Sequence, residues 1–180
     1  YFLDDPYEGE LMVFWMDLFG EWQDPSERQL IWKNKRKKLQ SIDYHSKNGD
    51  ITVQRGWWFS SHEQWKFLIL PYRDIDICNR IFVNGEKVRT IHSTENGIPG
   101  LYASVTDVKL RGYISATGIQ SVAFEKIQRK DVITPYASFP VILANQTIGL
   151  IWYKNMISAP KMQGMFGSTE AININGSLFH

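Results

Sequence analysis

Residues 55–72 read Arg-Gly-Trp-Trp-Phe-Ser-Ser-His-Glu-Gln-Trp-Lys-Phe-Leu-Ile-Leu-Pro-Tyr, and the interpretation of the rest of the chain starts from this stretch. Two adjacent tryptophans, Trp57 and Trp58, follow a glycine in a predicted loop. Ser60 and Glu63 have the spacing of a capping box, which predicts a helix start, and Pro71 ends that helix. Because a sugar ring offers an apolar face bordered by hydroxyls, flat rings beside carboxyl and amide groups indicate carbohydrate binding.

The chain before this stretch is predicted to be mainly helical. Asp5 and Pro6 form a start signal for a helix that ends at Gly20, and Asp24 caps a second helix running to about Gln40. The basic run at 33–38 is interpreted as a solvated face of that helix. Residues 41–54 alternate apolar and polar around an Asn-Gly turn, which predicts a small β-hairpin.

The chain after this stretch contains further helical patterns. A fourth helix is predicted from about Asp74 towards Ile91, with Asn84-Gly85 as a possible break. Residues 131–140 are predicted to be extended, 141–157 helical, and 161–180 loops. The chain is therefore predicted to be a single, mainly α domain.

Composition excludes several classes of protein. The 180 residues carry a net charge of +1, which predicts no nucleic-acid partner, and no stretch reaches the roughly 20 apolar residues of a membrane span. A single cysteine, Cys78, and four histidines without metal-site spacing predict no metal, and the absence of glycine-rich nucleotide motifs predicts no cofactor. Sequons at Asn145 and Asn175 predict a secreted glycoprotein. The start at Tyr1 suggests a processed or partial chain.

Several short motifs together resemble the glucoamylase-like, endo-β-1,2-glucanase superfamily of glycoside hydrolases. The motifs that carry the resemblance lie at 4–8, 14–20, 61–65, 133–139 and 164–171. The resemblance implies an (α/α)6 toroid, whose twelve helices of ~11–12 residues plus loops need about twice this length. We therefore expect a toroid-like fold or a partial ring of it.

Glycoside hydrolysis commonly uses two carboxyl groups, and three glutamates are candidates. Glu63 is the first choice for the proton donor, because burial among tryptophans would raise its pKa. It can equally be a helix cap. Glu95, in a loop before a tight turn, and Glu170, where the resemblance implies a loop acid, are candidates for its ionised partner. A surface acid and an ordinary cap are the alternatives for these two.

Six residues are predicted to bind the sugar. They combine aromatic rings in likely loop positions next to glycine or proline with polar groups of the 55–72 stretch. They are Trp57, Trp58, His62, Gln64, Tyr136 and Phe166.

The predicted function is that of a secreted glycoside hydrolase acting on a β-linked glucan, with β-1,2-glucan favoured by the resemblance. Its partner would be an oligosaccharide or polysaccharide. The alternative is a non-catalytic extracellular protein of the same fold that binds glycan or assembles into a structure. Two carboxyl groups facing each other at roughly 5–10 Å across a cleft would favour hydrolysis, whereas acids used as helix caps would favour the alternative.

Overall fold

The computed structural model describes residues 7–103, 105–107, 112–114 and 117–176. Helices predominate in these residues, and the strands form only two-stranded pairs, so the mainly α prediction is confirmed. The predicted toroid stays a prediction. The start signal at Asp5 and Pro6 lies outside the described residues.

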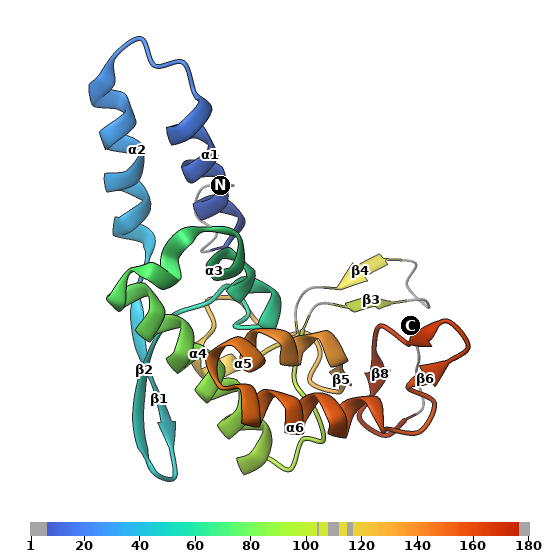
Figure 1. Cartoon of the computed structure of the whole chain (residues 1–180). Helices are drawn as coiled ribbons and strands as arrows, with labels where there is room; N and C mark the ends of the chain where they lie inside the picture. Colours follow the sequence, from blue (N-terminus) through green and yellow to red (C-terminus); the bar gives the residue numbers. More distant parts are fainter. Residues whose placement is uncertain (1–6, 104, 108–111, 115–116, 177–180) are drawn as a thin grey trace.

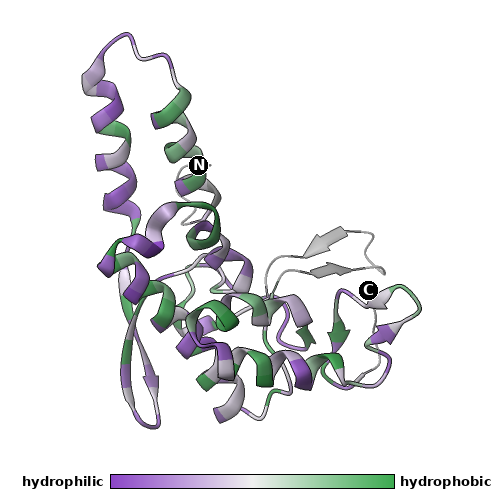
Figure 2. Ribbon diagram, viewed as in Figure 1, coloured by the Kyte–Doolittle hydropathy of each residue, from purple (hydrophilic) through white to green (hydrophobic). Residues whose placement is uncertain are grey.

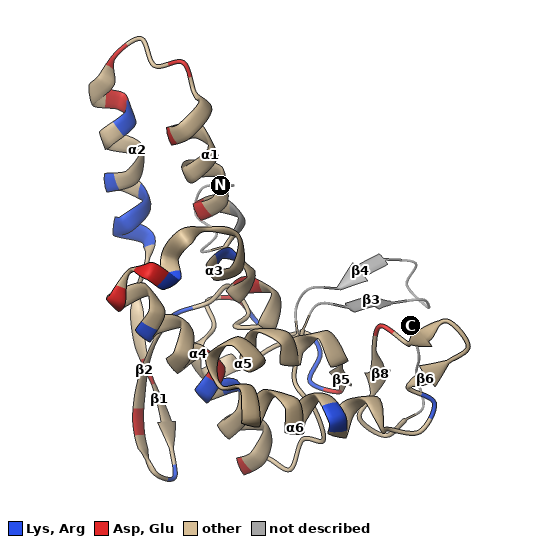
Figure 3. Cartoon of the chain, viewed as in Figure 1, with Lys and Arg blue, Asp and Glu red and all other residues tan. Residues whose placement is uncertain are grey.

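The described residues begin with a helical hairpin that projects from the rest of the molecule (Figure 1). Its helices are α1 (Glu8–Phe19) and α2 (Pro25–Lys38). Gly20 ends α1, and the Asp24 side chain caps α2 by accepting from the Ser26 N–H, as predicted. The basic run gathers on the last turns of α2 (Figure 3). Most of it is solvated as predicted, but Lys35 is buried.

The predicted β-hairpin is confirmed as β1 (Ser41–Ser46) paired antiparallel with β2 (Gly49–Gln54). Gly49 has φ +117°, a conformation that favours glycine at this turn. The inward residues Tyr44, Ile51 and Val53 pack with Phe59, Val88, Ile119 and Val122 in one of two buried clusters.

The predicted third helix consists of two short pieces, the 3₁₀ helix η1 (Ser61–Trp65) and α3 (Lys66–Ile69), and it is followed by the 3₁₀ helix η2 (Pro71–Asp74). Pro71 ends α3 and opens η2, since a proline fits a first helical position. The longest helix, α4 (Asp76–Glu95), continues through Asn84-Gly85. The predicted continuation past these residues is confirmed and the possible break is wrong; Gly85 packs against the Gln64 side chain, which a Cβ at this position would displace.

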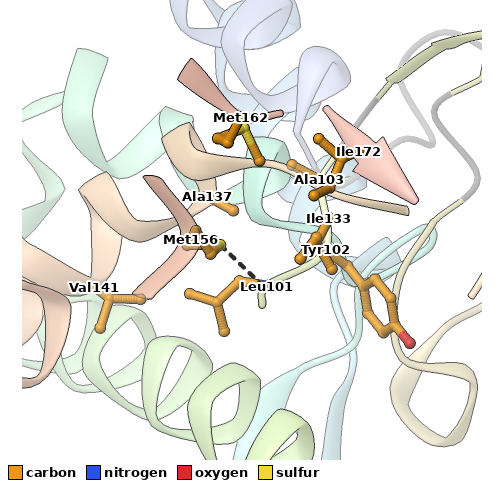
Figure 4. Close-up of a cluster of buried hydrophobic side chains, with 9 residues drawn as sticks. All are labelled: Leu101, Tyr102, Ala103, Ile133, Ala137, Val141, Met156, Met162 and Ile172. Carbon is orange, nitrogen blue, oxygen red and sulfur yellow. Dashed lines mark hydrogen bonds between the residues drawn. The ribbon is translucent and has the colours of Figure 1, made fainter. Parts of the chain in front are cut away.

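The second half of the chain surrounds the other buried cluster. It contains β3 (Val105–Asp107), β4 (Gly112–Ile114), η3 (Gln120–Val122), β5 (Val132–Ile133), η4 (Pro135–Ala137), α5 (Ser138–Ala144) and α6 (Gln146–Ile157). Leu101 and Met156 lie at the centre of this cluster, where the Leu101 N–H contacts the Met156 sulfur at 3.4 Å (Figure 4).

Two predictions for this half need correction. Residues 135–140 are helical rather than extended, because proline is accepted in a first helical turn. The tail contains short strands, β6 (Gln163–Gly164), β7 (Gly167–Ser168) and β8 (Ile172–Asn173), and β8 pairs with β5. Residues 177–180 of the predicted tail lie outside the described residues.

The apolar face of α1 is largely exposed on the projecting hairpin (Figure 2). Of the residues that define its helical period, Trp15, Leu18 and Phe19 are exposed, whereas Leu11 and Phe14 are half-buried. The spacing correctly predicted a helix with an apolar face, but the described residues leave much of that face exposed.

Candidate functional site

Residues 56–60, here called the tryptophan loop, connect β2 to η1. One side of this loop is held by the main chain of residues 119–125. Four hydrogen bonds make this connection: Gly56 N–H to Val122 O (3.2 Å), Phe124 N–H to Gly56 O (2.9 Å), Glu125 N–H to Trp57 O (2.9 Å) and Ile119 N–H to Trp58 O (3.1 Å). The main chain of the loop is thus fixed while its two indole rings stay half-buried.

The other side of the tryptophan loop is held by the Glu63 carboxylate. Its Oε2 accepts from Trp57 N–H at 2.8 Å, and its Oε1 accepts from Trp58 N–H at 2.8 Å and Ser60 N–H at 3.3 Å. The capping box of Ser60 and Glu63 is therefore confirmed. Gly56 allows this approach, because a Cβ there would overlap Glu63 Oε2.

Two opposing influences act on the pKa of Glu63. Burial raises the pKa of this carboxyl above its ordinary value, as the sequence predicted, whereas the Arg89 guanidinium and the three main-chain N–H groups lower it. Burial is the largest of these influences, so the pKa of Glu63 is raised overall.

A row of partly exposed rings, here called the aromatic band, runs across the tryptophan loop. Its members are Tyr7, His62, Trp58, Trp57 and Phe124, and neighbouring ring centroids are separated by 5.7, 6.5, 6.3 and 6.4 Å in that order. All five are half-buried, so each ring is supported by the protein and also reaches solvent. Such a surface is suited to stacking on the apolar faces of sugar rings.

His62 is uncharged in this band at neutral pH. Burial, together with the positive charge of Arg89, lowers the pKa of His62 to about 4. Its Nδ1 is hydrogen-bonded to the Ser60 hydroxyl at the start of η1. A neutral imidazole in this position offers a ring that can contact a sugar.

The three candidate acids have different surroundings. Glu63 is buried against the tryptophan loop. Glu95, the last residue of α4, accepts from the Lys47 N–H at 2.8 Å and so contacts the turn of the β1–β2 hairpin. Glu170 is exposed in the segment between β7 and β8. The structure shows the capping role for Glu63, and acid–base roles for the three stay predictions.

The other predicted sugar-binding residues are divided between interior and surface. Gln64 is buried and donates to Phe82 O at 3.3 Å, so its amide is used inside the protein. Tyr136 is half-buried and meets the partly exposed Trp65 edge-on, with centroids 6.1 Å apart. Phe166 is almost fully exposed at the turn of the β6–β7 hairpin.

Sequence reasoning missed Tyr7, Phe124 and Arg89 as parts of this site. Phe124 reaches the tryptophan loop only because residues 119–125 pair with it, and no local pattern shows that pairing. Tyr7 lies in an acidic stretch that suggested a helix cap. Arg89 belongs to α4 and follows the buried Phe82 by seven residues, and this helical spacing was the available signal that Arg89 faces inward.

Both sequon asparagines, Asn145 and Asn175, are exposed, and Asn145 also caps α6 by accepting from the Ile148 N–H at 3.1 Å. Within the described ranges, no three His, Cys, Asp or Glu side chains are grouped to hold a metal ion. No helix in the part of the chain that the structure describes is both long and apolar enough to cross a membrane.

Comparison with known proteins places the chain among the glycoside hydrolases. The family model described as endo-β-1,2-glucanase SGL matches residues 1–179. The chain therefore belongs to the endo-β-1,2-glucanase SGL family. No curated protein sequence matches it.

Two solved structures of a fungal enzyme are similar to the chain over nearly its whole length. An endo-β-1,2-glucanase from Talaromyces funiculosus in complex with sophorose is 47% identical, with a TM-score of 0.89 over 98% of this chain. A glutamate-to-glutamine mutant of that enzyme with β-1,2-glucan is 46% identical, also with a TM-score of 0.89. The chain spans 37% of the length of each of these structures.

Proposed function

We propose that this chain is the part of a secreted endo-β-1,2-glucanase that binds the glucan through the aromatic band. The observation that carries the proposal is the band itself: five half-buried neighbouring rings, two of which lie on a loop whose main chain is anchored on both sides. Membership of the family and the β-1,2-glucan and sophorose bound by the similar fungal enzyme support the choice of substrate.

The rings of Trp57 and Trp58 are the proposed stacking surfaces. Their planes are perpendicular to each other, with centroids 6.3 Å apart, so two successive sugar rings would have to turn to contact both. A β-1,2-linked chain turns at each linkage because the bond joins neighbouring ring positions. The pair is therefore suited to a bent glucan rather than to a flat ribbon.

Acid–base hydrolysis through carboxyl groups is the second part of the proposal. Glu63 has a raised pKa beside the aromatic band, which is the property of a proton donor. Glu95 and Glu170 remain the candidates for an ionised partner. The alternative, a non-catalytic glycan-binding or structural protein, is favoured by one observation: the Glu63 carboxylate already accepts three main-chain hydrogen bonds.

The test uses the protein that contains this chain, expressed at its natural length. We expect it to release reducing sugars from β-1,2-glucan and not from β-1,3- or β-1,4-glucans. Replacing both Trp57 and Trp58 with alanine should raise KM by roughly ten-fold or more, given about 0.5–1.5 kcal/mol for each lost ring contact beyond area burial. Trp15→Ala, on the exposed face of α1, is the matched control.

Three outcomes separate the proposals. Hydrolysis that depends on the two tryptophans supports the whole proposal. Binding of β-1,2-gluco-oligosaccharides without hydrolysis, measured by calorimetry, supports the non-catalytic alternative. Absence of both activities, or an equal effect of Trp15→Ala, would refute the proposed role of the aromatic band.

A further inference from the structure

Arg89 lies beneath the tryptophan loop and contacts it in two ways. Its Nη1 donates to Phe59 O at 2.6 Å, and its guanidinium lies 4.6 Å from the centroid of the Phe59 ring. Only 4% of Arg89 is exposed. Because Arg89 belongs to α4, these contacts connect the loop to the longest helix of the chain.

The residue that Arg89 contacts has an unfavourable backbone conformation. Phe59 has φ +57°, in the left-handed region that residues other than glycine rarely adopt. Such a conformation persists only where the surroundings enforce it. Here the enforcing contacts are the buried Phe59 ring and the hydrogen bond from Arg89 to the Phe59 carbonyl. Directly before Phe59 come the two tryptophans, so this bend sets where their rings lie.

Arg89 also serves two buried carboxyl groups. Its Nε donates to Glu86 Oε1 at 3.2 Å, and its positive charge favours the ionised forms of both Glu63 and Glu86. Glu86 is 1% exposed, and its Oε2 has no hydrogen-bond partner among the described residues. A cavity of about 20 Å³, lined by Glu63, Gln64 and Arg89 among others but not by Glu86, is large enough for one water molecule.

We propose that Arg89 is a positioning residue, which fixes the bend at Phe59 and the Glu63 carboxylate so that Trp57 and Trp58 are presented to the glucan in advance of binding. This inference rests on the proposed function of the aromatic band. A loop that is already ordered loses little conformational entropy when the sugar binds, so this order raises the affinity for the glucan. Glu86 in turn orients Arg89 by accepting the hydrogen bond from its Nε.

The test combines Arg89 with the tryptophans in a double-mutant cycle on the full-length protein. Arg89→Met removes the charge and the donors but keeps the length of the side chain. We expect it to raise KM for β-1,2-glucan roughly ten-fold or more, since it removes a charge-assisted hydrogen bond that orders the loop. In the background of Trp57→Ala with Trp58→Ala, Arg89→Met should leave KM nearly unchanged, because the rings it positions are already absent.

The controls distinguish positioning from general stability. Arg80→Met removes an exposed arginine from the same helix and should change neither KM nor the melting temperature. Arg89→Lys keeps the charge without the planar fork and should give an intermediate KM, which provides a second variant if Arg89→Met does not fold. Additive effects on KM in the cycle, or an unchanged KM in a folded Arg89 variant, would overturn the inference.

The same variants remain informative if the protein does not act on β-1,2-glucan. Quenching of tryptophan fluorescence by acrylamide then reports the loop directly. Arg89→Met should increase the quenching constant relative to wild type and to Arg80→Met, and this increase should disappear in the double tryptophan variant. An unchanged quenching constant would refute the positioning role, whereas an increase without any glucan binding would refute only the proposed function.

Discussion

The strongest prediction concerns Glu63→Gln, which removes one acceptor from a site with three donors. In wild type, Oε1 accepts from Trp58 and Ser60 and Oε2 accepts from Trp57. Glutamine can keep its oxygen at the Oε1 position and satisfy two donors, but its amide nitrogen then faces the Trp57 N–H. An unsatisfied buried donor costs about 1–3 kcal/mol, and loss of charge weakens the other two bonds by about 1 kcal/mol together, so we expect a total of about 2–4 kcal/mol.

The assay is equilibrium unfolding in urea followed by tryptophan fluorescence. Glu95→Gln is the matched control: its carboxylate accepts from the Lys47 N–H at an exposed hairpin turn, where an N–H left without a partner is solvated by water. We expect that variant to lose less than about 1 kcal/mol. If Glu63→Gln unfolded at the same urea concentration as wild type, the three main-chain hydrogen bonds could not be what holds the tryptophan loop, and the capping interpretation would be refuted.

Three further predictions concern the surroundings of the loop. Gly118→Ala places a Cβ against Trp58 O and should cost about 1–3 kcal/mol through overpacking, measured by urea unfolding. Lys66→Met removes the 2.6 Å partner of buried Glu10 and should cost about 3–5 kcal/mol, with partial recovery on adding Glu10→Gln. The pKa of His62 falls from 6.5 to about 4 on folding, so the unfolded chain binds more protons at this residue than the folded chain does. The contribution of His62 to the free energy of unfolding is therefore complete above pH 6.5 and is lost as the pH falls towards 4, by about 3 kcal/mol at most.

The controls for these variants come from the same chain. Gly164→Ala has only an ordinary contact for its new Cβ and should leave the urea midpoint unchanged. The contribution of His62 is the difference between wild type and His62→Gln at pH 7 and pH 4.5, because other groups titrate equally in both. Equal urea midpoints for Gly118→Ala and Gly164→Ala would contradict the overpacking argument. Additive losses of stability from Lys66→Met and Glu10→Gln would contradict the pairing of these two residues. The role of His62 would be contradicted if the stability of His62→Gln changed with pH as much as that of wild type.

The features that could be predicted from the sequence are those set by neighbouring residues. The capping box of Ser60 and Glu63 depends on a spacing of three, and the hairpin turn at Asn48-Gly49 depends on two adjacent residues. Both are confirmed. Helical periodicity likewise predicted α1, although it could not show that Trp15 on its apolar face would be exposed. Periodicity identifies an apolar face and carries no information about what covers it.

The features that could not be predicted depend on contacts between distant residues. Phe124 joins the aromatic band through hydrogen bonds between residues 119–125 and the tryptophan loop. Arg89 reaches Phe59 across 30 positions in the chain. Such contacts follow from how whole elements pack, and a single sequence contains no pattern that pairs them. Glu63 was recognised because its partners in the tryptophan loop are local, and Arg89 was missed because its partner in that loop, Phe59, is distant in sequence.

The two roles considered for Glu63 make different demands on the same carboxyl group. A cap must accept hydrogen bonds, whereas a proton donor must carry a hydrogen on one oxygen. Oε1 accepts two N–H hydrogen bonds and Oε2 accepts one, so a proton would be carried by Oε2.

Glu63→Gln is also uncharged, but its amide nitrogen, in the position of Oε2, neither accepts from the Trp57 N–H nor gives a proton to a leaving oxygen. If Glu63 is also the donor, hydrolysis falls far more than affinity for β-1,2-gluco-oligosaccharides, because the variant loses the transferable proton in addition to part of the anchor of the loop. If Glu63 acts only as a cap, affinity and hydrolysis fall together, because the loop that carries Trp57 and Trp58 loses its anchor. Measuring both quantities on one variant therefore separates the two roles.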